Sequence, residues 1–167
     1  SETLDLWTLT DWGSSDNDMP VPGKYDPADP TKAVVALINP EESLWYIRKH
    51  DGELLGAAPV NFGWGPNNDQ PVPNSFDNNP ATGANIAVYR PGTGEWFMRG
   101  VGVVEWGGSE GDVPVAGNYD GIGPADIAIY RPSDGETSAS WFIRHNADNT
   151  KRIDWGWVGD KPVPASY

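Results

Sequence analysis

Cysteine is absent from this chain of 167 residues, and histidine is limited to His50 and His145. Without cysteine there is no disulfide, no thiolate nucleophile and no zinc–thiolate site. The two histidines do not support a Ser–His–Asp arrangement, and we interpret them as ordinary strand-end residues. The carboxylates recur at repeated turn positions, which indicates architecture rather than one tuned acid–base pair. We therefore expect a protein that is not an enzyme.

Basic residues are also scarce. Eleven Lys and Arg face 24 Asp and Glu, which gives a net charge of −13 and a pI near 4.3. Such a chain repels the phosphate backbone of nucleic acids and the surface of anionic membranes. No apolar run reaches the roughly 18 residues that a membrane-spanning helix needs. The sequence therefore predicts neither nucleic-acid binding nor membrane insertion.

Glycine, proline and aromatic residues are abundant instead. The chain has 20 Gly, 16 Pro and nine Trp. Proline lacks the backbone N–H and glycine costs backbone entropy, so the two together disfavour helices. A disordered chain would be poor in aromatic residues. The composition favours an all-β protein made of many short strands joined by tight turns.

A tryptophan–glycine step followed by an Asp-x-Pro-Val segment occurs four times. The four copies comprise residues 11–13 with 18–26, 63–65 with 69–77, 105–107 with 112–120, and 154–156 with 160–167. Two further columns follow in each full copy, an Ala-x-Tyr-Arg-Pro-like segment (33–40, 85–91 and 126–132) and a Trp-aromatic segment (45–49, 96–100 and 141–145). Four extended segments within 40–50 residues are typical of one propeller blade.

These motifs resemble the FG-GAP/VCBS-type repeat of bacterial secreted and surface proteins, which is similar to the blades of integrin-like β-propellers. The resemblance covers almost the whole chain, and residues 106–141 match the pattern most fully. It implies a secreted or cell-surface protein that recognises glycans or a protein partner through its loops without catalysis. Fold resemblance says little about any single function, because propellers have many functions.

The predicted fold is a β-propeller-like array of four-stranded antiparallel blades, with three full repeats and two terminal half-repeats. The repeats comprise residues 12–63, 64–105 and 106–154, and the half-repeats comprise residues 1–11 and 155–167. Joined halves would form a fourth blade that lacks one strand. Alternatively, two chains share their halves in a larger ring, or the ends join head to tail in a filament. The second functional hypothesis is therefore a self-assembling structural subunit that forms homo-oligomers.

The resemblance implies calcium ligands in the turn that follows each Pro-Val segment. The residues that match the ligand positions are Asn118, Asp120 and Asp126 in the third repeat, Asp77 in the second and Asp26 in the first. Each turn departs from the family pattern, as at Ile122, where a ligand belongs. The alternative is that these side chains cap their turns by hydrogen bonds to the backbone, which Asp and Asn do well.

Eight of the nine tryptophans fall in two repeat columns, and only Trp157 lies outside them. We predict that Trp157 is exposed and binds a sugar ring on its flat face. The alternative is burial in the core or in an oligomer interface. Another column holds an aspartate two residues before proline (Asp18, Asp69, Asp112 and Asp160). These carboxylates are expected to make turns or to pair with strand arginines, which would hold neighbouring blades together.

Overall fold

A computed structural model describes residues 16–49, 53–56, 59–62, 68–77, 79, 81–132 and 138–164. This part of the chain contains strands and turns but no helix. The strands are β1 (Met19–Pro20), β2 (Val35–Asn39), β3 (Leu44–Arg48), β4 (Val60–Asn61), β5 (Gln70–Pro71), β6 (Ala87–Arg90), β7 (Glu95–Met98), β8 (Gly102–Glu105), β9 (Val113–Pro114), β10 (Ile127–Arg131), β11 (Ser138–Asn146) and β12 (Asn149–Trp157). No described helix is long and apolar enough to cross a membrane.

The strands form three four-stranded antiparallel sheets, β1–β4, β5–β8 and β9–β12, each in chain order. The predicted all-β class and its four-stranded units are confirmed. Each sheet begins with a two-residue strand that contains proline, namely Pro20, Pro71 or Pro114. Proline cannot donate to a ladder, so it is tolerated in the edge strand of a sheet.

The register of the central hairpin is the same in all three sheets. Trp45 pairs with Ile38 in the first sheet, Trp96 with Tyr89 in the second, and Trp141 with Tyr130 in the third. Alternation along a strand places these tryptophans on one face and their neighbours Tyr46, Phe97 and Phe142 on the other. Each sheet therefore has a tryptophan face and an opposite face at equivalent positions.

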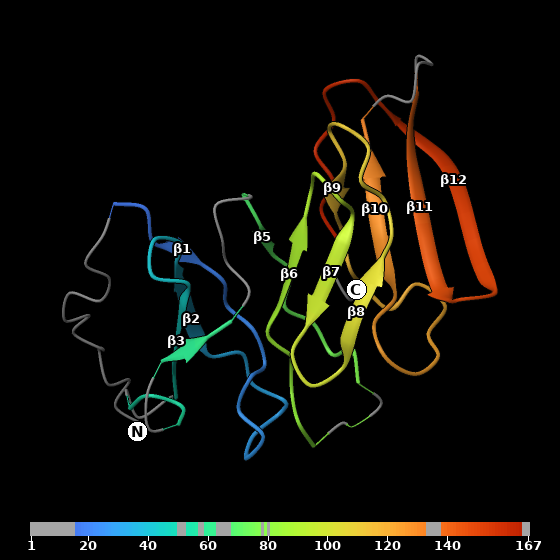
Figure 1. Ribbon diagram of the computed structural model, residues 1–167. Coiled ribbons are helices and arrows are strands. Elements are labelled where there is room, and N and C mark those ends of the chain that lie inside the picture. Colours follow the sequence, from blue (N-terminus) through green and yellow to red (C-terminus); the bar gives the residue numbers. More distant parts are fainter. Residues whose placement is uncertain are drawn as a thin grey trace, which may run out of the picture.

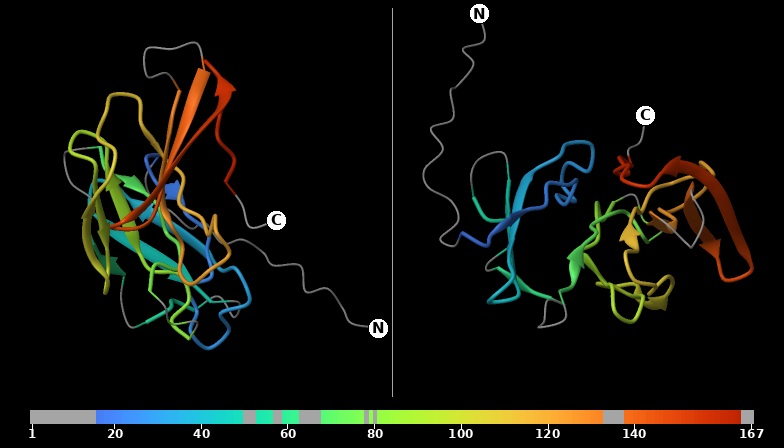
Figure 2. Two further views of the ribbon diagram at one scale, coloured as in Figure 1. Left: turned by 90° about the vertical axis from the view of Figure 1, so that its right-hand side faces the viewer. Right: turned by 90° about the horizontal axis from the view of Figure 1, so that it is seen from above.

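The three sheets stand side by side in chain order, with the first and third at the two ends of the row (Figures 1 and 2). The tryptophan face of one sheet packs against the opposite face of the next. Trp45 and Ile38 of the first sheet thus share a hydrophobic cluster with Ile86 and Val88 of the second. A closed propeller ring stays a prediction.

Equivalent backbone hydrogen bonds also join neighbouring sheets. The N–H of Ala84 donates to the carbonyl of Lys24, and the N–H of Ala125 donates to the carbonyl of Ser75, both at 2.7 Å. At the first junction Gly83 has a φ of +70°, and a Cβ there would lie 2.2 Å from the Lys24 carbonyl oxygen. The close approach of the first two sheets therefore requires glycine at this position.

Two equivalent tyrosines close the turn after the Pro-Val segment. The hydroxyl of Tyr25 donates to the carbonyl of Val21, and that of Tyr119 donates to the carbonyl of Val115. Phe76 occupies the same position in the second repeat and lacks the hydroxyl. Burial raises the pKa of Tyr25 well above its ordinary value, and burial followed by the nearby Asp126 charge raises the pKa of Tyr119 to about 12.

We expect the protein to lose stability in alkali. An unfolded tyrosine ionises near pH 10, whereas Tyr25 stays neutral in the folded state at that pH. Its stabilisation is therefore complete below pH 10 and is lost as the pH rises toward the folded pKa, with a slope of about 1.4 kcal/mol per pH unit. Urea unfolding of the wild type and Tyr25→Phe between pH 9 and 11 measures this slope. The substitution should flatten the profile, and parallel profiles would contradict the assignment.

Candidate functional site

The third Asp/Asn turn is closed by its own side chains. Asn118 donates to the carbonyl of Gly123 at 3.1 Å and accepts from the N–H of Gly121 at 2.7 Å. Asp120 Oδ1 accepts from the N–H of Ile122 at 2.8 Å. These contacts are the ones that the turn-capping alternative describes. Asn118 therefore has a structural role whether or not an ion binds nearby.

The first and second turns show the same kind of contact. Asp26 accepts from the N–H of Ala28 at 2.9 Å, and Asp77 accepts from Thr82 Oγ1 at 2.9 Å and Asn85 Nδ2 at 3.1 Å. Burial pulls the pKa of Asp77 upward, but the hydrogen bonds from Asn85 and Thr82 and from the backbone together lower it below its ordinary value. Calcium binding by these turns stays a prediction.

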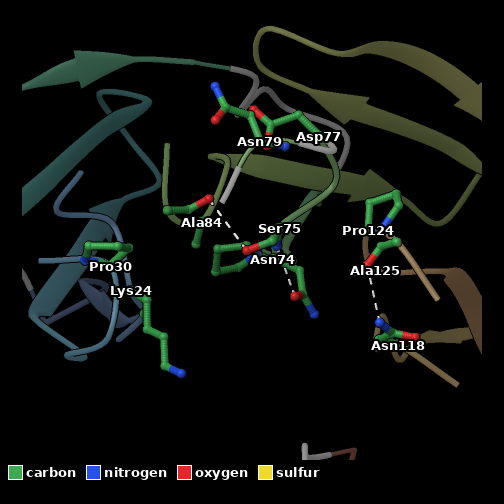
Figure 3. Close-up of a pocket in the computed structure, with 14 residues that line it drawn as sticks. Lys24, Pro30, Asn74, Ser75, Asp77, Asn79, Ala84, Asn118, Pro124 and Ala125 are labelled. Carbon is green, nitrogen blue, oxygen red and sulfur yellow. Dashed lines mark hydrogen bonds between the residues drawn. The ribbon is translucent and has the colours of Figure 1, made fainter. Parts of the chain in front are cut away.

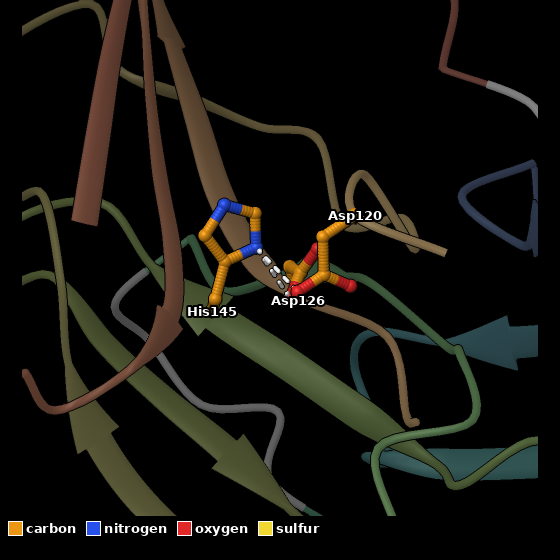
Figure 4. A group of neighbouring side chains, drawn as sticks. All are labelled: Asp120, Asp126 and His145. Carbon is orange, nitrogen blue, oxygen red and sulfur yellow. Dashed lines mark ion pairs between the residues drawn. The ribbon is translucent and has the colours of Figure 1, made fainter. Parts of the chain in front are cut away.

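The third repeat differs because a histidine joins its turn. Asp120 and Asp126 lie next to His145, and their ligand atoms are within 4.8 Å of one another (Figure 4). His145 lies near the end of β11, as expected, but its side chain is only 11% exposed and contacts the turn instead of the solvent. No local spacing signals this contact, because β11 brings His145 back to a turn about 20 residues earlier. His50 lies outside the described residues.

The repeated aspartates pair with strand arginines as expected, but within a sheet rather than between sheets. Arg90 binds Asp69 through Nε and Nη2 at 2.9 and 3.0 Å, and Arg131 binds Asp112 through the same atoms at 2.7 and 3.0 Å. The bond with Asp69 raises the pKa of Arg90 above its ordinary value, against the effect of desolvation. A different arginine joins two sheets: Arg144 Nη1 donates to the carbonyl of Glu105 at 3.0 Å.

A cavity of about 600 Å³ lies where the turns of all three sheets meet (Figure 3). Its wall includes Lys24 from the first sheet, Asn74, Ser75 and Asp77 from the second, and Asn118 from the third. Its lining mixes polar side chains with glycine, proline and alanine and contains no aromatic side chain among the described residues. Such a wall offers hydrogen bonds but no flat apolar face on which a sugar ring could stack.

A second cavity, of about 520 Å³, lies on the tryptophan face of the third sheet. Four aromatic side chains line it, and Gly156 and the segment 160–164 form the rest of its wall. The aromatic residues are Tyr119, Tyr130, Trp141 and Trp155. The rings of Tyr119 and Tyr130 meet that of Trp141 edge-on at 6.4 and 5.3 Å. At the matching place in the first two sheets, the next sheet fills the space.

Trp157 is 72% exposed, as predicted, but Trp155 is equally exposed. Trp155 borders the aromatic cavity, whereas Trp157 does not. The repeat pattern does not single out Trp155, because residues that recur in a tryptophan column typically pack between neighbouring sheets. Its counterpart Trp106 does pack there: Trp106 Nε1 donates to the carbonyl of Phe142 in the next sheet at 3.0 Å. Trp155 has no following sheet within the described residues.

Comparisons with protein-family models, with curated proteins and with solved structures give no match to this chain. The resemblance to FG-GAP/VCBS repeats therefore rests on the motifs alone and stays a prediction.

Proposed function

We propose that this chain is a non-catalytic assembly module whose third sheet binds another sheet of the same kind, supplied by a second copy of the chain. The observation that carries the proposal is Trp155, which is 72% exposed at the position where Trp106 joins two sheets. Large aromatic side chains in a partly formed pocket are typical of the residues that dominate protein interfaces.

The opposite end of the molecule offers the complementary surface. Ile86 and Ile127 lie on the faces that receive the preceding sheet, and they are 6% and 9% exposed. Val35 is the equivalent residue of the first sheet, and it is 56% exposed. The third sheet thus exposes its tryptophan face at one end of the molecule. The first sheet exposes, at the other end, the kind of face that covers a tryptophan face at the internal junctions. The contact is head to tail, so copies join as a ring or a filament.

The internal junctions also predict which residues meet in the assembly. Tyr46 stands at the position of Phe142, one residue after the paired tryptophan. We expect Trp155 Nε1 to donate to the backbone carbonyl of Tyr46 in the neighbouring copy, as Trp106 does to Phe142. The net charge of −13 on each copy opposes this contact. Added salt screens that repulsion and should therefore strengthen association.

Glycan binding is the second candidate function, and the aromatic cavity favours it. Trp141 and Trp155 offer ring faces for sugar C–H groups, while the neighbouring Asp160 and Lys161 offer hydrogen bonds. Under this second candidate we propose the cavity beside Trp155, rather than Trp157, as the sugar site. Self-association and glycan binding would use the same surface. The two functions are therefore distinguished by what binds there, a second copy of the chain or a sugar.

Replacing Trp155 should abolish self-association. We expect the wild type to show a molar mass that rises with protein concentration, and Trp155→Asp to stay at the 18.1 kDa of one chain. A carboxylate buried without a partner costs several kcal/mol, which would weaken association by at least about a hundredfold. Light scattering on a sizing column, repeated at low and high salt, measures this effect.

Trp157→Asp is the matched control, because Trp157 has the same exposure and the substitution makes the same change in charge. It should assemble like the wild type, since Trp157 lies outside the cavity lining. A wild type that stays at one-chain mass up to millimolar concentration would contradict the assembly proposal. Glycan binding that Trp155→Ala abolishes and Trp157→Ala preserves would then identify the cavity as a sugar site.

A further inference from the structure

Three side chains from three different segments converge beside the third turn (Figure 4). His145 lies near the end of β11. Asp126 lies just before β10 and forms a β-bridge with Gly117, and Asp120 lies in the turn between Gly117 and Asp126. His145 Nδ1 is 3.1 Å from Asp126 Oδ1 and 3.5 Å from Asp120 Oδ2. None of the residues that line the aromatic cavity belongs to this cluster.

Each carboxylate is held in place by a backbone N–H through its other oxygen. Asp126 Oδ2 accepts from the N–H of Tyr119 at 2.8 Å, and Asp120 Oδ1 accepts from that of Ile122 at 2.8 Å. One oxygen of each group is thus fixed toward His145. Such hydrogen bonds orient ligands at metal centres.

The histidine nitrogen that faces these oxygens is buried and makes no hydrogen bond. Asp126 is itself only 4% exposed. A buried polar atom without a hydrogen bond is costly, and two carboxylates directed at one place repel each other. A cation between the three atoms would remove both costs.

The second repeat shows how this corner is satisfied without a cation. Asn85 stands where Asp126 does, and its Nδ2 donates to Asp77 Oδ2 at 3.1 Å while its Oδ1 accepts from the N–H of Phe76 at 2.8 Å. Gly100 stands at the position of His145. The third repeat therefore lacks the amide donor and has a second carboxylate and an imidazole nitrogen in its place.

We propose that Asp120, Asp126 and His145 bind a divalent transition-metal ion of the zinc class. Imidazole nitrogen with carboxylate oxygen suits zinc, whereas calcium takes an all-oxygen shell of six to eight ligands. Ligands bonded at about 2.0–2.2 Å in a tetrahedron stand roughly 3.3–3.6 Å apart. The 3.5 Å separation from Asp120 lies within that range, and the 3.1 Å separation from Asp126 lies slightly below it, so a small outward movement of the side chains would admit the ion. Asp120 keeps 30% of its side chain exposed, so water can reach the ion and complete its shell.

Zinc titration of the metal-free protein by calorimetry tests the site. The wild type should bind one ion per chain, and its melting temperature should rise with zinc and fall again with chelator, because the ion binds only the folded state. Asp126→Asn and His145→Gln should each weaken binding at least about tenfold. Cobalt gives a second readout, since coordination by these residues produces a visible absorption band that both variants lose.

The variants are chosen so that loss of the fold cannot explain the result. Asp126→Asn copies the hydrogen-bonding arrangement that Asn85 makes in the second repeat, and circular dichroism checks that the strands remain. Asp148→Asn removes the same charge from an exposed turn and should bind zinc like the wild type. Equal affinity in all four proteins, no saturable zinc binding, or calcium binding tighter than zinc would each overturn the proposal.

Discussion

Trp96→Ala is expected to lower the free energy of unfolding by about 3–5 kcal/mol, the usual cost of emptying a large aromatic site in a core. Trp96 has no exposed surface and packs against Tyr89 and Phe76, with ring centroids at 5.1 and 6.4 Å. Its indole N–H also donates to the carbonyl of Trp106 at 3.0 Å. The substitution removes the contacts that hold β7 to its own sheet and to the next.

The repeats supply the controls for this prediction. Trp45 is equally buried in the first sheet, so Trp45→Ala should cost about as much. Trp141 is only half-buried, because the described chain places no sheet over it. Trp141→Ala should therefore cost distinctly less at dilute concentration, where copies do not associate. Urea unfolding by circular dichroism measures all three variants. An equal loss at Trp141 and Trp96 would mean that the third sheet is already covered.

Asp69→Ala is expected to lower the free energy of unfolding by a similar amount, about 3–5 kcal/mol, because it leaves Arg90 without its buried partner. The Asp69 carboxylate is fully buried and binds Arg90 with both oxygens. Asp112→Ala should be as damaging, since Asp112 also accepts from the N–H of Ser109 at 3.0 Å. Asp160 belongs to the same sequence column but is exposed, so Asp160→Ala should cost far less.

The double variant Asp69→Leu with Arg90→Leu separates the two parts of this effect. Removing both charged groups avoids leaving the partly buried Arg90 guanidinium with only the Glu95 carboxylate, 3.5 Å away, so the double variant should be more stable than Asp69→Ala. Denaturant midpoints of the single and double variants give the comparison. If the double variant is the less stable protein, the pair contributes net stability beyond the penalty of breaking it.

The strand pattern could be predicted from the sequence because its signals are local. Proline marks the first strand of each sheet, and paired aromatic columns mark each central hairpin, so the order and number of strands per repeat follow from spacing. The equivalent pairing of Trp96 with Tyr89 and of Trp141 with Tyr130 reflects this regularity. The same local signals recur in each repeat, so the strands predicted for one repeat agree with those predicted for the others.

The candidate sites were harder to predict because they depend on contacts between distant segments. Nothing near His145 in the sequence shows that β11 returns it to Asp120 and Asp126. The pairing of Arg131 with Asp112 within a sheet, rather than between sheets, depends on which edge β9 occupies. The exposure of Trp155 depends on whether a sheet follows it, which its own column cannot reveal.

The assembly proposal requires the tryptophan face of the third sheet in one copy to bind the face of the first sheet that contains Val35 in a second copy. Mixing Trp155→Asp with Val35→Asp tests it most directly, because each variant keeps only one of the two faces. Each variant alone should be monomeric, and an equimolar mixture should form a complex of twice the 18.1 kDa chain mass and grow no further. A mixture that stays monomeric, or a Val35→Asp variant that dimerises by itself, would contradict it.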